Sequence, residues 1–416
     1  MRIRKLLRVR FVVYSFTEQE KIMAELTPMM QKYMETKEQY KDCILFYRLG
    51  DFYEMFFDDA IVASKELEIA LTGKSCGLEE RAPMCGIPYH AVETYLARLV
   101  SRGYKVAICE QVEDPKLAKG LVKREVIRVV TPGTNLDVQS LEASKNNYLM
   151  CIAYTSDGIG ISAADVTTGD YYVTEVEDLR KLKKYEPSEI ICNEAFLVSG
   201  YDVEDLKSRL HMSVSSLESH MFDDDGCRRI LMRHFKVNTL IGLGVEEFPT
   251  GILAAGALLQ YLYDTQKTDL EHFTHISPYL TSKYMLLDSS TRRNLELTET
   301  LREKQKRGSL LWVLDKTKTA MGGRLLRNYI EQPLIDKEEL EKPLDAIQEL
   351  NQDSISRDEI REYLNPVYDL ERLLSKVTYK TANPRDLIAF RNSLQMLPPI
   401  KTVLSGFQKE ELAAIR

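Results

Sequence analysis

The sequence contains no run of apolar residues long enough to cross a membrane and no cysteine spacing typical of a zinc site. A membrane-spanning helix needs about 18 or more consecutive apolar residues, so we predict a soluble protein without a membrane segment. The seven cysteines are odd in number and widely spread, and none lies in C-x-x-C order. This pattern argues against a disulfide framework and favours the reducing cytoplasm.

An excess of positive charge is also missing, because the formal net charge is −7. A protein that coats nucleic acid is normally basic, so any nucleic-acid site in this chain requires basic residues gathered locally. Residues 116–128 hold five basic side chains against one acid, Glu125, and Lys74 and Arg81 lie in a loop expected after a long helix that ends near Leu71. The candidate phosphate-binding residues are Lys74, Arg81, Lys116, Lys119, Lys123, Arg124 and Arg128. A solvated loop without a partner is an equally good interpretation for any single lysine.

The length of 416 residues and the hydrophobic content of 44% allow several cores, and we expect two to four domains. Residues 1–16 are rich in arginine and free of acid, as in a transit peptide, but a natural start at Met23 is the simpler interpretation. We predict four parts: an extension at 1–22, a mixed α/β domain at 23–137, a second α/β domain at 138–270, and a helical domain at 271–416.

The hydrophobic pattern predicts the elements of these parts. In the first part we expect a helix at TPMMQKYMETKEQY, a strand at CILFYRL, a long helix from Tyr53 to about Leu71, and a turn at Gly103 between helix and strand. A strand at EVIRVV then ends at Pro132 and Gly133. The second part begins with three β-rich runs separated by SDG and TTGD turns, which predict an antiparallel meander. From about Pro249 the pattern is mostly helical, with long helical stretches at GILAAGALLQYLYDTQK and SSTRRNLELTETLREKQK.

The segment Gly50-Asp51-Phe52-Tyr53-Glu54-Met55-Phe56-Phe57 combines aromatic and acidic residues where a strand gives way to the predicted long helix. Asp51 followed by Glu54 is a capping-box pattern, in which both side chains accept hydrogen bonds from free backbone N–H groups. On spacing alone, this purely structural interpretation is the more economical one.

Three longer stretches resemble the mismatch-binding domain of the MutS family: FYRLGDFYEMFFDDA, PMCGIPYHAVETYLARLVSRGYKVAICEQVEDP and REVIRVVTPGT. The resemblance continues through ADVTTGDYYV, LDSSTRRNLELTETL and LLWVLDKTKTAMGGRLLRNYIEQPL, and it covers nearly everything from Met23 to Arg416. It implies a small mixed α/β mismatch-recognition domain, an RNase-H-like α/β connector, and the start of an all-helical core and lever domain.

In that family a Phe-x-Glu motif probes DNA from the minor groove, and the matching residues here are Phe52 and Glu54. A mispaired base stacks poorly, so an aromatic wedge enters beside it at a lower unstacking cost than at a paired step. A carboxylate is repelled by phosphates, so Glu54 can act only through a specific hydrogen bond to a displaced base. Met84 could also pack near the groove, although a buried methionine is more common.

The resemblance also implies partners and cofactors for a full-length protein. These are double-stranded DNA with mismatches or small loops, MutL, a second copy in a homodimer, and ATP with Mg²⁺. For this chain we expect no ATPase activity and no cofactor, with the nucleotide-binding loop lying beyond Arg416. Gly73-Lys74-Ser75 ends like such a loop, but the motif needs a glycine where Glu68 stands. The chain stops inside a helix-like segment, which we interpret as a truncation.

Two other functions stay open at this point. A MutS relative could serve recombination or act as a protein-interaction module, although the Phe52 and Glu54 pair argues against this. An RNase-H-like nuclease could use Asp165, but two-metal catalysis needs further convergent acids. Asp170 lies in a turn, and Asp223, Asp224 and Asp225 resemble a solvated loop or helix start. His272 and His275 lack the order and the third ligand of a metal site.

Overall fold

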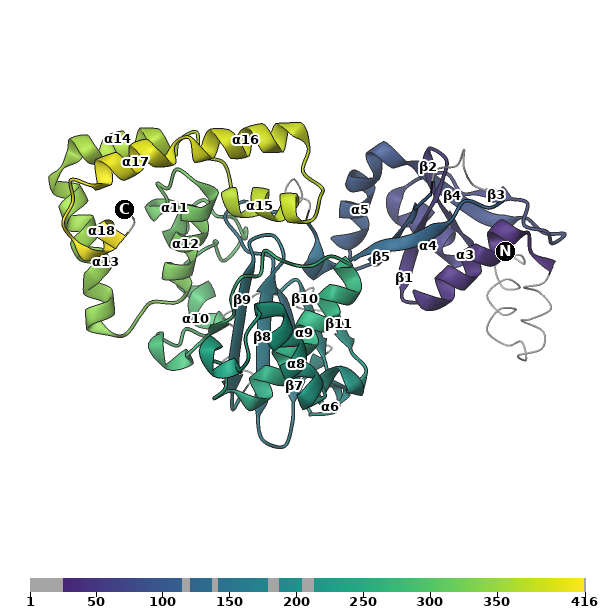
Figure 1. The fold of residues 1–416 in the computed structure, drawn as a ribbon, viewed down its shortest axis with the longest axis horizontal. Helices are drawn as coiled ribbons and strands as arrows, with labels where there is room; N and C mark the ends of the chain where they lie inside the picture. The colour runs from purple at the N-terminus through teal and green to yellow at the C-terminus, as the bar shows by residue number, and fades with distance from the viewer. Residues whose placement is uncertain (1–24, 114–119, 137–140, 179–186, 204–212, 415–416) are drawn as a thin grey trace. The chain divides into compact units, whose positions relative to one another are not determined.

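The computed structural model describes residues 25–113, 120–136, 141–178, 187–203 and 213–414. The chain divides into two compact units, Met1–Pro132 with Thr265–Lys267 and Gly133–Asp264 with Thr268–Arg416 (Figure 1). The expected extension at 1–22 lies outside the described residues, and so do Lys116 and Lys119. The domain boundaries proposed from the sequence stay a prediction.

The first unit is built on a six-stranded sheet with the strand order β3-β4-β2-β1-β5-β6. The central strand β1 pairs antiparallel with β2 and parallel with β5. The strands are β1 (Cys43–Leu49), β2 (Phe52–Phe56), β3 (Thr72–Lys74), β4 (Ala82–Pro88), β5 (Lys105–Gln111) and β6 (Arg124–Val130). The helices are α3 (Pro28–Gln39), α4 (Phe57–Leu67) and α5 (Val92–Val100).

Helices cover both faces of this sheet. Successive residues of a strand point their side chains to opposite faces, so one strand contributes to two apolar clusters. Tyr53 and Met55 of β2 pack in one apolar cluster with residues of α4 and α5. Phe56 belongs to the other cluster, together with Met30 and Tyr33 of α3. The ring centres of Phe56 and Tyr33 lie 4.9 Å apart. The helix α3 therefore covers the Phe56 end of this face, whereas Phe52 at the other end of β2 is exposed.

The predicted long helix from Tyr53 to Leu71 is wrong at its start. Phe52–Phe56 is a strand, and the helix α4 runs only from Phe57 to Leu67. The strand forms because β2 finds pairing partners on both sides, β1 and β4, so that both edges of its backbone are hydrogen-bonded. Beyond the helix, Thr72–Lys74 is a short strand and not the loop that we expected for Lys74. The other predicted elements of this unit are confirmed, with Gly103 in a left-handed turn conformation (φ 85°) after α5.

The second unit contains another six-stranded sheet, with the order β11-β10-β7-β8-β9-β12. The predicted antiparallel meander is confirmed, since β7 pairs with β8 and β8 with β9. The strand β10 then runs parallel to β7 and β11 parallel to β10. The strands are β7 (Leu149–Tyr154), β8 (Ile159–Asp165), β9 (Asp170–Val176), β10 (Glu189–Cys192), β11 (Ser213–Ser216) and β12 (Ser277–Pro278).

The helices α8 (Asp224–Phe235) and α9 (Pro249–Gln266) share one large apolar cluster with this sheet. Of the two interpretations of the acidic run, a solvated loop or a helix start, the helix start is confirmed, because Asp223 is the N-cap of α8 and its carboxylate accepts a hydrogen bond from the Gly226 N–H. A short helix, α6 (Glu194–Leu197), contributes Phe196 to the cluster on the other face. Both faces of the sheet are thus covered by apolar side chains.

The rest of the second unit is helical, as predicted. Its helices are α10 (Ser289–Asn294), α11 (Leu310–Leu314), α12 (Ala320–Glu331), α13 (Lys337–Gln352), α14 (Ser354–Leu364), α15 (Leu370–Thr378), α16 (Pro384–Leu394), α17 (Leu397–Leu404) and α18 (Glu410–Ala414). The long helical stretch expected in SSTRRNLELTETLREKQK is wrong, since α10 ends at Asn294. Glu296 has a left-handed backbone (φ 49°) that breaks the helix, and its carboxylate accepts a hydrogen bond from the Leu301 N–H.

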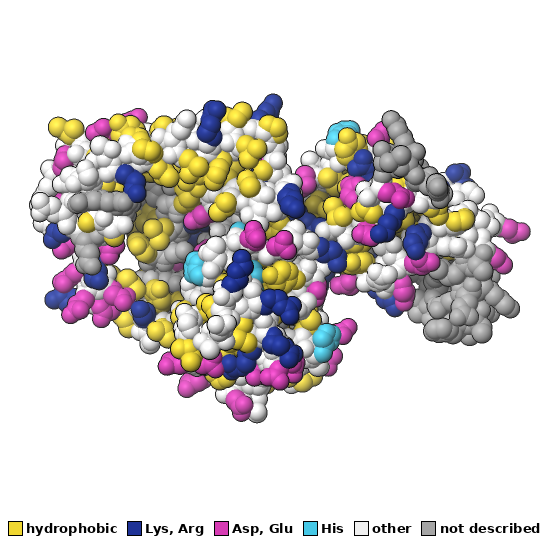
Figure 2. Space-filling view, viewed as in Figure 1, with side chains coloured by type: hydrophobic (Ala, Val, Ile, Leu, Met, Phe, Trp, Pro, Cys, Tyr) yellow, Lys and Arg dark blue, Asp and Glu magenta, His cyan; other side chains and the backbone are white. Residues whose placement is uncertain are grey.

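The helical part leaves many apolar side chains at the surface, and Figure 2 shows them gathered near α16. Among those exposed by 40% or more are Leu374, Val377, Leu387, Ile388, Leu394 and Leu397. This part therefore buries its apolar residues less completely than the two sheets do. No helix in the described part of the chain has the length and apolar character that a membrane crossing requires.

Candidate nucleic-acid interface

Phe52 is the first residue of β2 and follows a tight turn at Gly50 and Asp51. Gly50 has a left-handed backbone (φ 58°), which glycine adopts without strain. The Phe52 side chain is 46% exposed, whereas Tyr53, on the other face of the strand, is buried. Phe52 is paired with Leu49 of β1 and Pro88 of β4. The turn thus presents a large aromatic ring at the open end of the sheet face that α3 covers elsewhere.

Arg48 and Tyr89 hold the turn that carries Phe52. The Arg48 Nε donates to the Gly50 carbonyl at 2.5 Å, and the backbone N–H of Tyr89 donates to the Asp51 carbonyl at 3.0 Å. The Arg48 guanidinium stacks on the Tyr89 ring, 3.9 Å from its centre. Both carbonyls of the turn therefore have donors, and the backbone before Phe52 is fixed by Arg48 of β1 and by Tyr89, which directly follows β4.

A polar cluster beneath the turn fixes Arg48 in its place. Arg48 Nη1 lies 3.3 Å from Glu110 Oε1, and the Tyr53 hydroxyl donates to the same carboxylate. Burial, followed by the bond to Glu110, raises the pKa of Tyr53 above its ordinary value. The phenol consequently stays a hydrogen-bond donor at every physiological pH, and Glu110 is held between two donors.

Glu54 lies two residues after Phe52 and shares its face of β2. Its carboxylate forms an ion pair with Lys74 of β3, with Oε2 and Nζ 2.5 Å apart. The residue opposite Glu54 on β4 is Gly86, which has no side chain, and the Glu54 side chain is 17% exposed. The capping-box interpretation is wrong, because the N-cap of α4 is Phe56 and it makes no side-chain cap bond.

Arg124, one of the predicted cations, is hydrogen-bonded to the strand that leads into the Phe52 turn. Its Nε donates to the Arg48 carbonyl at 2.7 Å, and its guanidinium lies 5.4 Å from the centre of the Tyr47 ring. Lys123 is exposed and paired with Glu125 at 2.6 Å, a hydrogen bond that raises the pKa of Lys123. Arg81 is exposed immediately before β4. The structure thus brings Glu54, Lys74 and Arg124 together with Phe52 in one unit.

Other predicted residues are less clearly part of this surface. Arg128 lies four residues along β6 from Arg124, and its Nε donates to Gln266 Oε1 at 3.1 Å. Met84 is partly buried and packs against the apolar cluster that contains Phe56. Such packing is common for methionine. Lys116 and Lys119 lie outside the described residues.

The sequence prediction did not include Arg48, Tyr89 or Glu110. Arg48 is a charged residue at the end of an otherwise apolar strand, two residues before the turn glycine. This position could have indicated in the sequence that Arg48 contacts the turn. Tyr89 lies between β4 and α5, and Glu110 lies in β5. Only the pairing of the strands shows that both residues contact Arg48. The role of Lys74 as the partner of Glu54 was likewise missed, because Lys74 was expected in a loop.

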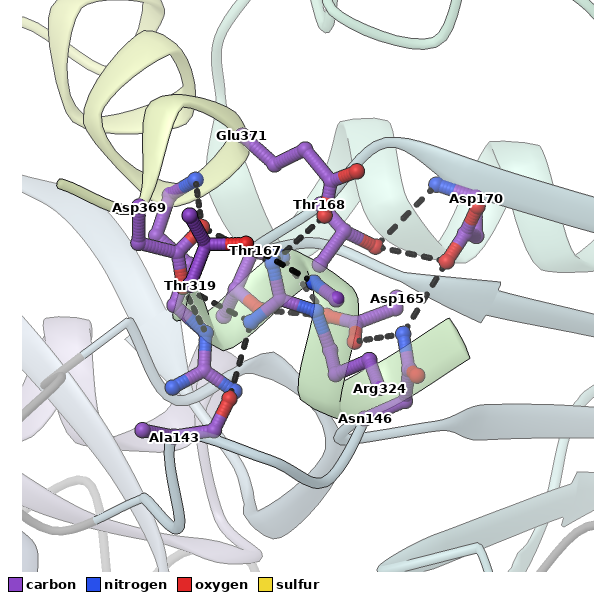
Figure 3. A network of polar contacts seen from close by, with 12 residues as sticks. Ala143, Asn146, Asp165, Thr167, Thr168, Asp170, Thr319, Arg324, Asp369 and Glu371 are labelled. Carbon is purple, nitrogen blue, oxygen red and sulfur yellow. Dashed lines mark hydrogen bonds and ion pairs between the residues drawn. The ribbon is translucent and has the colours of Figure 1, made fainter. Parts of the chain in front are cut away.

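Asp165, the candidate nuclease carboxylate, is fully buried and serves the polypeptide backbone. It accepts hydrogen bonds from the backbone N–H of Asn147 at 2.9 Å and of Thr167 at 2.8 Å, and from the Asn146 side chain at 3.0 Å (Figure 3). Asn146 also bridges to Asp170 at 3.0 Å. These contacts tie the β8–β9 turn to the segment that precedes β7. Within the described ranges, no group of three or more His, Cys, Asp or Glu side chains is arranged to hold a metal.

The Gly73-Lys74-Ser75 segment does not fit a nucleotide phosphate. Gly73 and Lys74 belong to the extended strand β3 and not to a loop that opens a helix, and the Lys74 ammonium is paired with Glu54. His272 is buried, and burial lowers its pKa to about 4. Its ring packs against Tyr379, with the ring centres 5.0 Å apart.

Three models of protein families match the chain, each over one segment. They are described as MutS domain I, matching residues 27–139, MutS domain II, matching 147–276, and MutS domain III, matching 290–415.

Curated relatives match over nearly the whole chain. A DNA mismatch repair protein MutS of Lachnoclostridium phytofermentans is 67% identical over 397 residues, which cover 94% of this chain and 43% of that protein. The protein of the same name from Ruminiclostridium cellulolyticum is 53% identical, with 93% of this chain and 45% of that protein covered. The chain thus spans less than half the length of these relatives.

Proposed function

Because the chain belongs to the MutS family and carries its domains I, II and III, we propose that it recognises mispaired or unpaired bases in duplex DNA. The observation that carries this proposal is the exposure of Phe52, 46% of whose surface is accessible at the tip of a turn held by Arg48. An apolar ring of this size gains nothing from exposure to water, and the fixed backbone beneath it suits a side chain that must enter another molecule.

Phe52 acts as a wedge from the minor groove. Inserting an aromatic ring between base steps costs a few kcal/mol of unstacking, and this cost is lower where a base is mispaired or unpaired. The difference in deformability selects the defect without reading the sequence around it. Rigid presentation matters because a mobile ring would lose conformational entropy on insertion and so weaken the binding.

Glu54 discriminates between a displaced base and a paired one. It lies on the face of β2 that carries Phe52, its side chain is 17% exposed, and the paired residue on the neighbouring strand, Gly86, has no side chain that would block it. A carboxylate can accept a hydrogen bond from a base nitrogen that pairing no longer occupies. Near phosphates it is otherwise repelled, so Glu54 contributes selectivity and not affinity.

Affinity comes from phosphate contacts of basic residues of the same unit. Arg124 joins the Phe52 turn directly through the Arg48 carbonyl, and Lys123 and Arg81 are exposed. Lys116, Lys119 and Arg128 complete the proposed set, together with Lys74. Each phosphate neutralised releases counterions, so binding weakens as salt is added.

For the full-length protein we propose an ATP-dependent homodimer that binds MutL and acts in the cytoplasm. The second unit would supply the connector, whose β9-β8-β7-β10-β11 order, with an antiparallel meander followed by parallel strands, supports the RNase-H-like assignment. ATP and Mg²⁺ would be bound by sequence outside this chain. A role in recombination or protein interaction alone would not explain why Phe52 is exposed.

The test is a titration of the chain with fluorescent duplexes that are fully paired or carry one G·T mispair. Fluorescence anisotropy measures the binding. Phe52→Ala should abolish the preference for the mispaired duplex without changing the thermal midpoint, because the ring is not part of the core. Ile127→Ala is the matched control, since Ile127 is 45% exposed on β6 of the same sheet. Equal loss of preference in both variants, or none in Phe52→Ala, would reject the wedge.

A further inference from the structure

The carboxylate proposed to probe the displaced base already has a partner in this structure. Lys74 Nζ lies 2.5 Å from Glu54 Oε2, and the two side chains are 34% and 17% exposed. Both groups are therefore partly desolvated but still reachable from solvent. Because only 17% of the Glu54 side chain is exposed while Lys74 holds it on the sheet, Glu54 has to turn away from the lysine before it can reach a base in the groove.

The position of Lys74 makes such an opening possible. It is the last residue of the three-residue edge strand β3, and its side chain extends along the sheet face, with Nζ 5.5 Å from the centre of the buried Phe56 ring. Among the described residues, the polar partner of its ammonium is Glu54. Lysine has a long flexible stem, so the ammonium can turn outward while the stem stays on the sheet.

We propose that Lys74 is a specificity-determining residue that exchanges Glu54 for a DNA phosphate when Glu54 turns to a displaced base. The inference rests on the proposed function of Phe52 and Glu54 and adds a coupled role for the lysine. At rest the pair is neutral, so Glu54 does not repel the DNA. When the base takes the carboxylate, the released ammonium gains a phosphate, so both charges stay paired throughout.

The exchange occurs only at a defect. On fully paired DNA the base edges are engaged with one another, Glu54 finds no free donor, and Lys74 stays with the carboxylate. The mispaired complex therefore contains one phosphate contact that the paired complex lacks. Such a contact makes the salt dependence of binding differ between the two duplexes, since each phosphate contact adds about 0.9 to the slope of log K against log salt.

The experiment measures that slope for the whole chain on paired and G·T-mispaired duplexes. We expect Lys74→Gln to reduce the slope on the mispaired duplex by about 0.9 and to leave the slope on the paired duplex unchanged. Glu54→Gln frees Lys74 in both complexes, so it should raise the slope on the paired duplex by about 0.9. Lys123→Gln is the matched control, because Lys123 is also ion-paired, with Glu125 at 2.6 Å, and should change both slopes alike or neither.

The charge-swapped variant Glu54→Lys with Lys74→Glu separates exchange from simple structural pairing. It restores the ion pair but places the carboxylate on β3, so it should recover the thermal midpoint and not the mispair preference. Recovery of both, or equal slope changes on the two duplexes in Lys74→Gln, would overturn the exchange. If the unaltered chain shows no mispair preference at all, the proposed function itself fails, and this outcome is distinct because it appears before any substitution.

Discussion

Arg48 makes contacts that depend on the shape of its guanidinium. The planar group stacks 3.9 Å from the centre of the Tyr89 ring while its Nε reaches the Gly50 carbonyl and Nη1 approaches Glu110. A lysine ammonium is a point charge and cannot serve the stack and both acceptors together. At the residue scale, the arginine therefore fixes the backbone that presents Phe52.

Replacing Arg48 by lysine should loosen this turn. We expect the preference for mispaired DNA to fall several-fold, while the free energy of unfolding falls by only about 1 kcal/mol, the usual contribution of one hydrogen bond or cation–π contact. Anisotropy titration and urea denaturation measure the two effects. Arg98→Lys serves as the control, since Arg98 bonds to the Leu67 carbonyl on α4 and does not contact the turn. An unchanged preference in Arg48→Lys would contradict the positioning role.

His272 gives the second unit a specific sensitivity to acid. Burial lowers its pKa to about 4, whereas a histidine in an unfolded chain titrates near 6.5. The unfolded state therefore binds the proton first as the pH falls. This contribution to stability is fully present above about pH 6.5 and is lost progressively toward pH 4, by up to about 3 kcal/mol.

His272→Phe removes the titrating group and keeps an aromatic ring beside Phe273 and Tyr379. Urea denaturation between pH 7 and pH 4.5 should show a smaller loss of stability in this variant than in the unaltered chain. Fluorescence of Trp312, the single tryptophan, reports the second unit. Identical pH dependence of the two proteins would show that His272 is not the source.

At the scale of elements, the sequence predicted the helices and strands whose hydrophobic pattern is local. It missed the strands that form because they pair with neighbouring strands. The run CILFYRL has the bounds of β1 because it is apolar and ends at a turn glycine. The run from Tyr53 to Phe56 was predicted as the start of a helix, and the spacing of Asp51 and Glu54 matches a cap, but backbone pairing with β1 and β4 outweighs that weak preference. The Phe52 and Glu54 motif could be found in the sequence, whereas the contacts of Arg48 and Lys74 arise only from the sheet.

Gly256 shows how closely α8 and α9 approach each other. A methyl group built at Gly256 would lie 2.3 Å from Cys227 Cβ and 2.4 Å from Cys227 Cα. Alanine gains about 1 kcal/mol over glycine from helix propensity, but forcing atoms into a packed core typically costs about 1–3 kcal/mol. Because the overlap involves backbone, which cannot rotate away, we expect the cost to exceed the gain.

Gly256→Ala should therefore lower the urea concentration at which half of the second unit is unfolded. Trp312 fluorescence measures this unfolding. Gly242→Ala is the control, since a methyl group there meets no atom within 4 Å. A more stable Gly256→Ala variant would mean that α8 and α9 can separate without loss, against the packing described above.

At the scale of the whole molecule, a buried ionic network joins distant parts of the second unit. Arg324 of α12 forms two hydrogen bonds with Asp369, at 2.7 and 2.8 Å, and donates to the Ala143 carbonyl at 2.9 Å (Figure 3). Arg372 of α15 donates to the carbonyls of Glu142 and Lys145. The segment before β7 is thereby tied to two helices that follow it by more than 170 residues.

Arg324→Met should destabilise the second unit strongly. The substitution leaves Asp369 without its bidentate partner in a place where the arginine side chain is only 4% exposed. Removing one partner of a buried pair typically costs about 3–5 kcal/mol, whereas an exposed pair contributes about 0–1 kcal/mol. Arg357→Met, which breaks the Arg357–Asp358 contact at the surface, is the control. Similar urea midpoints for the two variants would contradict the network's role.

The central claim is that Phe52 inserts beside a mispaired base, and site-specific photocrosslinking tests it most directly. A halogenated thymine is placed in a duplex either opposite guanine or correctly paired, the complex is irradiated, and the attached peptide is identified. Crosslinking captures even weak complexes. The account predicts an adduct that forms preferentially at the mispair, maps to Phe52 and disappears in Phe52→Ala. Equal crosslinking on paired DNA, or an adduct that maps elsewhere, would contradict it and leave Phe52 as a structural residue.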